Sequence, residues 1–186
     1  VGIHDREGVA PGASYTRTYT FVRNVGPGGA KNYNLSWVGN DGTFSSAGSV
    51  GLPKGVPVTL DVNVSATSSG AHSAILNLDD PDTAGVDYQT MNVVVAADPF
   101  AAPNYAVTKT GTLGPGQFET HFFNVPAGTP AFKVDMTGGG PAGAGAIRFL
   151  RWHPYGVGID SNGVSNCYNP VIGGCSTGSA TSRTTS

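Results

Sequence analysis

The chain has 186 residues, enough for one large or two small domains with cores of their own. Only 12% of the residues are charged, whereas Gly contributes 28 and Pro 13, a composition that favours short strands and turns over helical bundles. The net charge of -2 gives no electrostatic footprint for nucleic acid or an anionic membrane, and no apolar run approaches the ~20 residues that span a bilayer.

Alternating apolar and polar residues predict β-strands through the first half of the chain. In three runs the apolar members share one parity: Tyr15, Tyr19 and Phe21; Tyr33, Leu35 and Trp37; Val58, Leu60, Val62 and Val64. We expect the third run to form an antiparallel hairpin with residues 71–78, through a turn at 68–70. About seven such strands in residues 1–98 predict a fibronectin-III- or immunoglobulin-like β-sandwich, with Trp37 as its core anchor.

Two prolines separate this half from the next. Pro99 and Pro103 lack amide donors, so no regular helix or ladder is expected at 99–105. A solvated linker would rarely carry side chains as large as Phe100 and Tyr105. We therefore predict a packed linker over 99–105, with Phe100 and Tyr105 packing between two domains and little hinge motion.

Strand patterns return at 105–113, 118–125 and 131–136, and again from residue 146. They predict a second, jelly-roll-like β-sandwich over 106–186, which makes the whole chain all-β with two tandem sandwiches. Strong strands are few, and the end of the chain consists mostly of Ser, Thr, Gly and Ala. Either this tail wraps the domain as an irregular loop, or the natural protein continues and supplies missing strands. We favour the second interpretation, a sandwich that is incomplete at its C-terminus.

Catalytic motifs are missing from the sequence. It contains no G-x-S-x-G elbow, no Gly-Thr-Ser-Met-Ala segment and no H-E-x-x-H, and its Cys and His spacings do not suit zinc. The four histidines are scattered and are interpreted as surface or hydrogen-bonded core residues: His4, His72, His121 and His153. We predict no catalytic residue, and thus a chain that is not itself an enzyme.

Four aspartates on one loop are weak candidates for calcium ligands: Asp79, Asp80, Asp82 and Asp87. Carboxylate oxygens suit Ca²⁺, but the spacing lacks the alternating ligands and terminal Glu of an EF-hand. A solvated loop between strands is the favoured interpretation. No metal site and no other cofactor is expected.

Two further patterns have a functional and a structural interpretation. The glycines at 26–29 could cradle a phosphate only before a helix, and because they join two strand patterns we expect a hairpin turn. Several aromatic residues could form a sugar-stacking strip, although in β-sandwiches such residues usually belong to the core. They are Tyr15, Tyr19, Tyr105, Phe122 and Trp152.

Cys167 and Cys175 are close in sequence in a chain poor in charge. A disulfide between them would contribute about 2–3 kcal/mol by loop-closure arithmetic. A redox switch would usually show closer spacing or basic neighbours, so a structural disulfide is expected. Disulfides persist in oxidising compartments, which predicts a secreted, extracellular protein.

Four segments together resemble the C-terminal region of tripeptidyl-peptidase-II-like, subtilisin-family proteases of the secreted actinobacterial type. They are GIHDR at 2–6, HSAILNLDDP at 72–81, GPGQFETHFFNVPAG at 114–128 and RFLRWHPYG at 148–156. In that family the Asp, His and Ser of the triad lie upstream, so none of them maps onto this chain. Family members also continue past the cysteine pair.

The resemblance implies a non-catalytic accessory region whose partner is its own upstream catalytic domain. Its expected roles are bracing that domain, mediating self-association or helping to hold a protein substrate. Two other classes remain open. A carbohydrate- or surface-binding module would show coplanar exposed aromatics, and a structural self-assembly module would show an apolar patch or a free strand edge.

Overall fold

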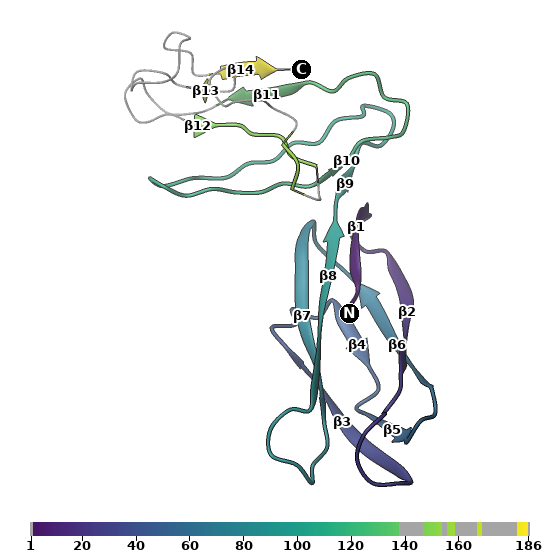
Figure 1. Cartoon of the computed structure of the whole chain (residues 1–186). Helices are drawn as coiled ribbons and strands as arrows, with labels where there is room; N and C mark the ends of the chain where they lie inside the picture. Colours follow the sequence, from purple (N-terminus) through teal and green to yellow (C-terminus); the bar gives the residue numbers. More distant parts are fainter. Residues whose placement is uncertain (1, 138–146, 154–155, 159–166, 169–181, 186) are drawn as a thin grey trace. The chain divides into compact units, whose positions relative to one another are not determined.

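The computed structural model describes residues 2–137, 147–153, 156–158, 167–168 and 182–185 (Figure 1). They belong to two compact units. Unit 1 comprises Val1–Pro99 and Thr120–Asn124, and unit 2 comprises Phe100–Glu119 and Val125–Ser186. The described residues form strands and contain no helix, which confirms the all-β class. None of them belongs to a helix long and apolar enough to cross a membrane.

Unit 1 is a sandwich of two sheets, as predicted. Sheet A has five strands in the order β1 (His4–Val9), β8 (Tyr88–Ala96), β7 (Gly70–Asp79), β3 (Ala30–Val38) and β5 (Ser49–Pro53). Sheet B has three, in the order β2 (Ser14–Phe21), β6 (Val58–Ser65) and β4 (Phe44–Ser46). β1 runs parallel to β8, and the other neighbours are antiparallel.

The alternation in the sequence places the core between the sheets. On β6, Leu60, Val62 and Val64 are buried, whereas the residues between them face solvent. The largest fully buried side chain is Phe44, on the short strand β4. Trp37, the predicted anchor, is half-buried and stacks on Phe44 with 5.5 Å between ring centroids. Phe44 is therefore the core anchor, and the partly buried Trp37 packs against it.

The predicted hairpin of residues 58–65 with 71–78 is wrong, because β6 and β7 lie in different sheets. β7 pairs with β3 and β8, while β6 pairs with β2 and β4. Both strands turn an apolar face to the same core, one from each side. An alternation of period two is identical for strands that pair and strands that face one another. The connection 66–69 begins with fully buried Ala66 and crosses between the sheets.

The glycines at 26–29 do not form a hairpin turn either, since they link β2 of sheet B to β3 of sheet A. Arg23, which is only 7% exposed, stabilises this crossing loop through hydrogen bonds of its buried side chain. Its guanidinium donates hydrogen bonds to the carbonyls of Leu52, Val25, Pro27 and Gly29. A single buried cation thereby binds the carbonyls of Val25 and Pro27 in this loop and ties the loop to Leu52 of β5.

Unit 2 contains two short ladders, β11 (Val134–Thr137) with β14 (Ser182–Thr185) and β12 (Ile147–Arg148) with β13 (Cys167–Tyr168). β11 alternates half-buried Val134 and Met136 with exposed residues, as expected. The strands predicted at 105–113 and 118–125 are largely wrong. Only β10 (Phe123–Asn124) forms, and it pairs with β9 (Asp98–Pro99) within unit 1. Nearly every residue of 105–121 is exposed, so these limbs lack the buried face that would stabilise a ladder. A complete second sandwich stays a prediction.

We expect Phe44→Ala to lower the free energy of unfolding of unit 1 by about 3–5 kcal/mol, because it removes a fully buried ring and leaves a cavity. Urea unfolding followed by fluorescence in a Trp152→Phe background measures this, since Trp37 then reports on unit 1. Phe118, which is 87% exposed, provides the matched control: Phe118→Ala should change stability by less than about 0.5 kcal/mol. Equal losses in both variants would contradict the assignment of Phe44 as core anchor.

Candidate functional site

The start of the chain is locked into unit 1. Ile3 is 6% exposed and belongs to the core, and its carbonyl accepts a hydrogen bond of 2.8 Å from the Val93 amide. Gly2 lies so close to β8 that a Cβ atom there would stand 1.7 Å from the Met91 carbonyl oxygen. Only glycine fits at this point without a shift of the backbone.

A buried polar network holds the same segment. The Ile3 amide donates to the Tyr19 hydroxyl at 2.9 Å and to the Asn92 Oδ1 atom at 3.3 Å, and Tyr19 donates to the same Oδ1. The fully buried Asn92 donates through Nδ2 to the Ala74 and Thr90 carbonyls. Tyr19 belongs to sheet B and Asn92 to sheet A, so the network ties both sheets to the first residues of the chain.

An ion pair closes the edge between β1 and β2. The Arg17 guanidinium lies 2.9 Å from the Asp5 carboxylate, to which the Tyr15 hydroxyl donates at 2.7 Å. Partial burial by itself would raise the pKa of Asp5, but the hydrogen bonds from Arg17 and Tyr15 outweigh it and leave this pKa below its usual value. Burial and the neighbouring carboxylate raise the pKa of Tyr15. The three side chains act as a structural clamp.

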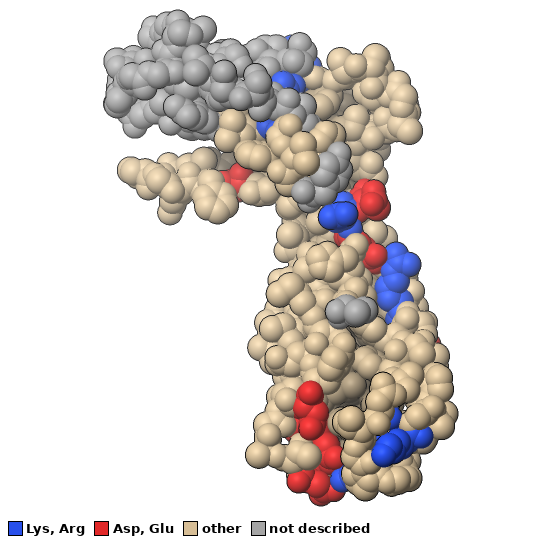
Figure 2. Space-filling view, in the orientation of Figure 1, with Lys and Arg blue, Asp and Glu red and all other residues tan. Residues whose placement is uncertain are grey.

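The loop that carries the four candidate aspartates lies at one end of unit 1, where Figure 2 shows acidic side chains in red. Asp79 ends β7, and the other three candidates have partners within the protein. The Lys31 ammonium lies 3.2 Å from Asp80 and 2.7 Å from Asp82. Asp87 accepts from the Asp80 amide at 2.6 Å and from the Thr83 hydroxyl.

Hydrogen bonds shape the electrostatics of this loop. The Asp82 amide donates to Asp80, and with the nearby Lys31 it lowers the pKa of that carboxyl. The Lys31 ammonium thus occupies the position that a metal cation would need in order to bind Asp80 and Asp82. No group of three or more side chains that could hold a metal ion occurs among the described residues. That this loop is solvated and holds no calcium stays a prediction.

The one buried histidine of the described residues, His72, is engaged at both ring nitrogens. Nδ1 lies 2.6 Å from the Asp41 carboxylate and Nε2 lies 2.9 Å from the Ser68 carbonyl. A catalytic base needs a free nitrogen facing substrate, so this pair fastens the crossing after β6 instead. Hydrogen bonds from Thr43 and His72 lower the pKa of Asp41 to about 2. His4, His121 and His153 are exposed.

The two outer faces of the sandwich differ in chemistry. The outer face of sheet B carries hydroxyl, amide and carboxylate groups that bond across the strands, as Thr16 does to Asn63 and Thr18 to Asp61. The outer face of sheet A carries exposed Val38 and Met91. These exposed apolar side chains distinguish the outer face of sheet A from the polar outer face of sheet B.

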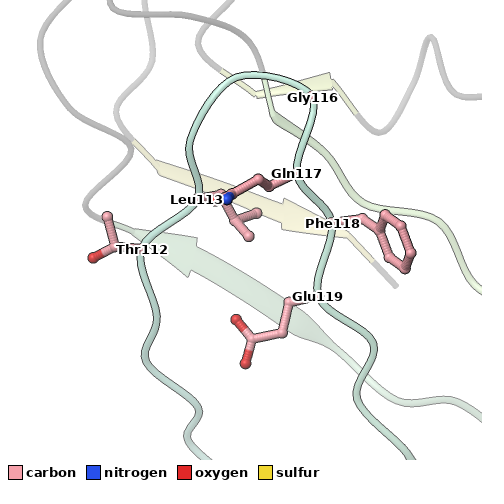
Figure 3. Close-up of a pocket in the computed structure, with 6 residues that line it drawn as sticks. All are labelled: Thr112, Leu113, Gly116, Gln117, Phe118 and Glu119. Carbon is pink, nitrogen blue, oxygen red and sulfur yellow. The ribbon is translucent and has the colours of Figure 1, made fainter.

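Unit 2 contains an open depression inside the loop 112–119 (Figure 3). Gln117 closes the loop by accepting a hydrogen bond of 2.7 Å from the Gly114 amide. The Phe118 ring points away from the loop in Figure 3 and is 87% exposed. The lining residues offer one carboxylate, Glu119, but neither a histidine nor a cysteine, so they do not form a catalytic constellation.

The other candidates have different outcomes. Tyr15 and Tyr19 pack against the core of unit 1 and are not free to stack on a sugar, whereas Tyr105 and Trp152 are 63% and 59% exposed. Cys167 begins β13 and Cys175 lies outside the described residues, so the disulfide stays a prediction. The packing of Phe100 and Tyr105 between two domains also stays a prediction.

The fold and the locked N-terminal strand define a protein of the immunoglobulin-like β-sandwich class. Residues 1–96, which is more than half of the chain, match the sequence profile of a family described as "Ig-like domain in actinomycete serine proteases". The chain belongs to this family. The predicted sandwich and the predicted association with actinobacterial serine proteases are thereby confirmed.

Other comparisons add little. A search of curated proteins gave no match. Among solved structures, the chain is similar to WR4, an MSP family member of C. elegans, with 10% identity, a TM-score of 0.35 and coverage of 48% of this chain and 91% of that one. The chain is also similar to SSP-19, an MSP-domain protein like family member of the same worm, with 10% identity and a TM-score of 0.34. This similarity covers 49% of this chain and 94% of that one.

Tripeptidyl peptidase 2 (TPP II) is a further structural neighbour, with 21% identity and a TM-score of 0.41. The similarity covers 55% of this chain but 9% of that one. Similarities of this strength carry no functional conclusion.

We expect Gly2→Ala to lower the free energy of unfolding of unit 1 by about 1–3 kcal/mol, because the added methyl group must push β1 away from the Met91 carbonyl. Gly51, in edge strand β5, has open space around it and serves as the matched control. Gly51→Ala should leave stability within about 0.5 kcal/mol of the parent. Equal effects in urea unfolding would show that the start of β1 is not locked.

Acid should destabilise unit 1. The pKa of Asp41 is about 2 in the folded chain against 3.8 ordinarily, so its contribution is fully present above the unfolded value and disappears as the pH falls through the folded one. The lowered pKa values of Asp5 and Asp80 act in the same direction. We expect the urea midpoint to fall between about pH 5 and about pH 2, and to fall less steeply in Asp41→Asn. An identical slope in this variant would contradict the role of Asp41.

Proposed function

We propose that the chain is a non-catalytic accessory region of a secreted, subtilisin-like serine protease, and that unit 1 braces the catalytic domain preceding it in the parent protein. The family match supports the association with a serine protease. Bracing is the finer part of the proposal and is argued from the contacts of unit 1.

The observation that carries the proposal is the locked start of the chain. Ile3 is buried and Gly2 fits closely against β8, so the polypeptide is held from its second residue onward. A domain attached in front of Gly2 would be joined to a fixed point of a rigid sandwich. A flexible tether would instead leave the first residues exposed and without core contacts.

The chemistry of unit 1 supports a non-catalytic role. Its buried histidine is engaged by Asp41 and Ser68, and its ion pairs bridge strands and loops of the sandwich. These groups satisfy one another, whereas a catalytic group must face substrate. Substrate handling or self-association would not require an anchored first strand, and bracing does.

The reading frame upstream of Val1 provides the first test, because we expect it to encode a subtilase domain with its Asp, His and Ser. The second test uses that parent protease and measures the half-life of its activity at elevated temperature. Tyr19→Phe removes one hydroxyl from the anchor and should shorten the half-life several-fold.

Tyr88→Phe is the matched control, since Tyr88 is 45% exposed, and it should leave the half-life unchanged. Equal half-lives in both variants would argue against bracing through the anchored strand. Serine-dependent peptidase activity of the present chain alone would contradict a non-catalytic role.

A further inference from the structure

The outer face of sheet A carries one continuous apolar row. Val38 on β3 lies directly opposite Ile75 on β7, and Ile75 lies opposite Met91 on β8. Residues paired in this way project from the same face with neighbouring side chains. Val38 is 53% and Met91 58% exposed, and half-buried Val93 extends the patch along β8. We call these four residues the sheet A patch.

The row beside this patch is polar but internally satisfied. Ser36, Asn77 and Gln89 are paired across the same three strands. Gln89 donates to Asn77 at 2.8 Å, and Asn77 donates to Ser36 at 3.4 Å. Polar groups that are already hydrogen-bonded lose little when a partner displaces water from them. Neither of these two rows contains a charged side chain, so a partner can cover both rows without desolvating an ion.

Sheet B provides the contrast within the same unit. Its corresponding cross-strand row consists of Ser45, Asn63 and Thr16, all polar, and the acidic residue Asp61 follows on β6. Covering that face would bury a carboxylate and would gain no apolar contact. The two faces of one sandwich thus differ in fitness for docking, and sheet A is the suitable one.

The place of β1 beside the patch supports one occupant for it. Gly2 touches the Met91 backbone, and His4 pairs with Val93, so a preceding domain would be tethered at the edge of the sheet A patch. Tethering over a few residues gives effective concentrations of about millimolar, which allows a small patch to hold a partner that it could not bind freely. We infer that the sheet A patch docks the catalytic domain of the parent protease. This inference rests on the proposed function and adds the place where the two domains meet.

Met91 is itself a probe of this contact. Hydrogen peroxide oxidises exposed methionine to the sulfoxide, and peptide mass spectrometry measures the rate. The chain has two methionines, and Met136 in unit 2 serves as the internal reference. We expect Met91 to oxidise several-fold more slowly in the parent protease than in the present chain, with the rate of Met136 unchanged.

Two lysine variants of the parent protease sharpen the test. Val38→Lys places a charge in the patch and should restore rapid oxidation of Met91. Ser45→Lys occupies the equivalent flanking position on sheet B and should leave the protection intact. Both positions are solvent-exposed, so each variant is expected to fold.

Equal oxidation of Met91 in the parent and in the present chain would overturn the inference. The same holds if the present chain alone protects Met91 increasingly with concentration, because a second copy would then cover the patch. Neither result overturns bracing, because bracing is tested separately by the effect of Tyr19→Phe on the half-life of the parent protease. A reading frame without a protease domain would instead defeat the proposed function itself.

Discussion

The structure of unit 1 depends on the buried amide of Asn92. A polar side chain with no exposure destabilises a core unless every group finds a partner, and here each of them does. One set of hydrogen bonds joins sheet A, the Tyr19 hydroxyl of sheet B and the Ile3 amide. Because the last of these lies at the start of the chain, the same constraint aligns the two sheets and fixes the point where a preceding domain would attach.

Other buried polar groups act in the same way at the crossings between sheets. Arg23 collects the carbonyls of the connection from β2 to β3, and His72 holds the Ser68 carbonyl after β6. A sandwich must carry its chain from one sheet to the other, and these crossings leave backbone groups without ladder partners. Apolar packing fills the space between the sheets, while these few side chains determine how the chain passes around it.

The strands of unit 1 could be predicted from sequence because burial on one face imposes a period of two, as in Leu60, Val62 and Val64. Their pairing could not, since β6 and β7 show the same alternation whether they pair or face one another. Phe44 was missed as an anchor because β4 has only three residues and no alternation. The apolar residues of 105–125 predicted strands, but most of them remain exposed, and only the two residues of β10 form a ladder, with β9.

The candidate site was harder to predict. Nothing in the sequence joins Asn92 to Tyr19, or Val38 to Ile75, since both contacts depend on the register of strands far apart in the chain. The aspartates were visible as a cluster, but their partner Lys31 lies 49 residues before Asp80. Local patterns reveal which residues face inward, and only the fold reveals which residues meet.

Native-state hydrogen exchange of the Ile3 amide tests the central claim most directly. If the network locks the start of the chain, this amide exchanges only when unit 1 unfolds, with an opening free energy close to that of the buried Leu76 amide. A frayed terminus would exchange at nearly the rate of an unstructured peptide while Leu76 stays protected. That result would contradict both the anchor and the bracing role derived from it.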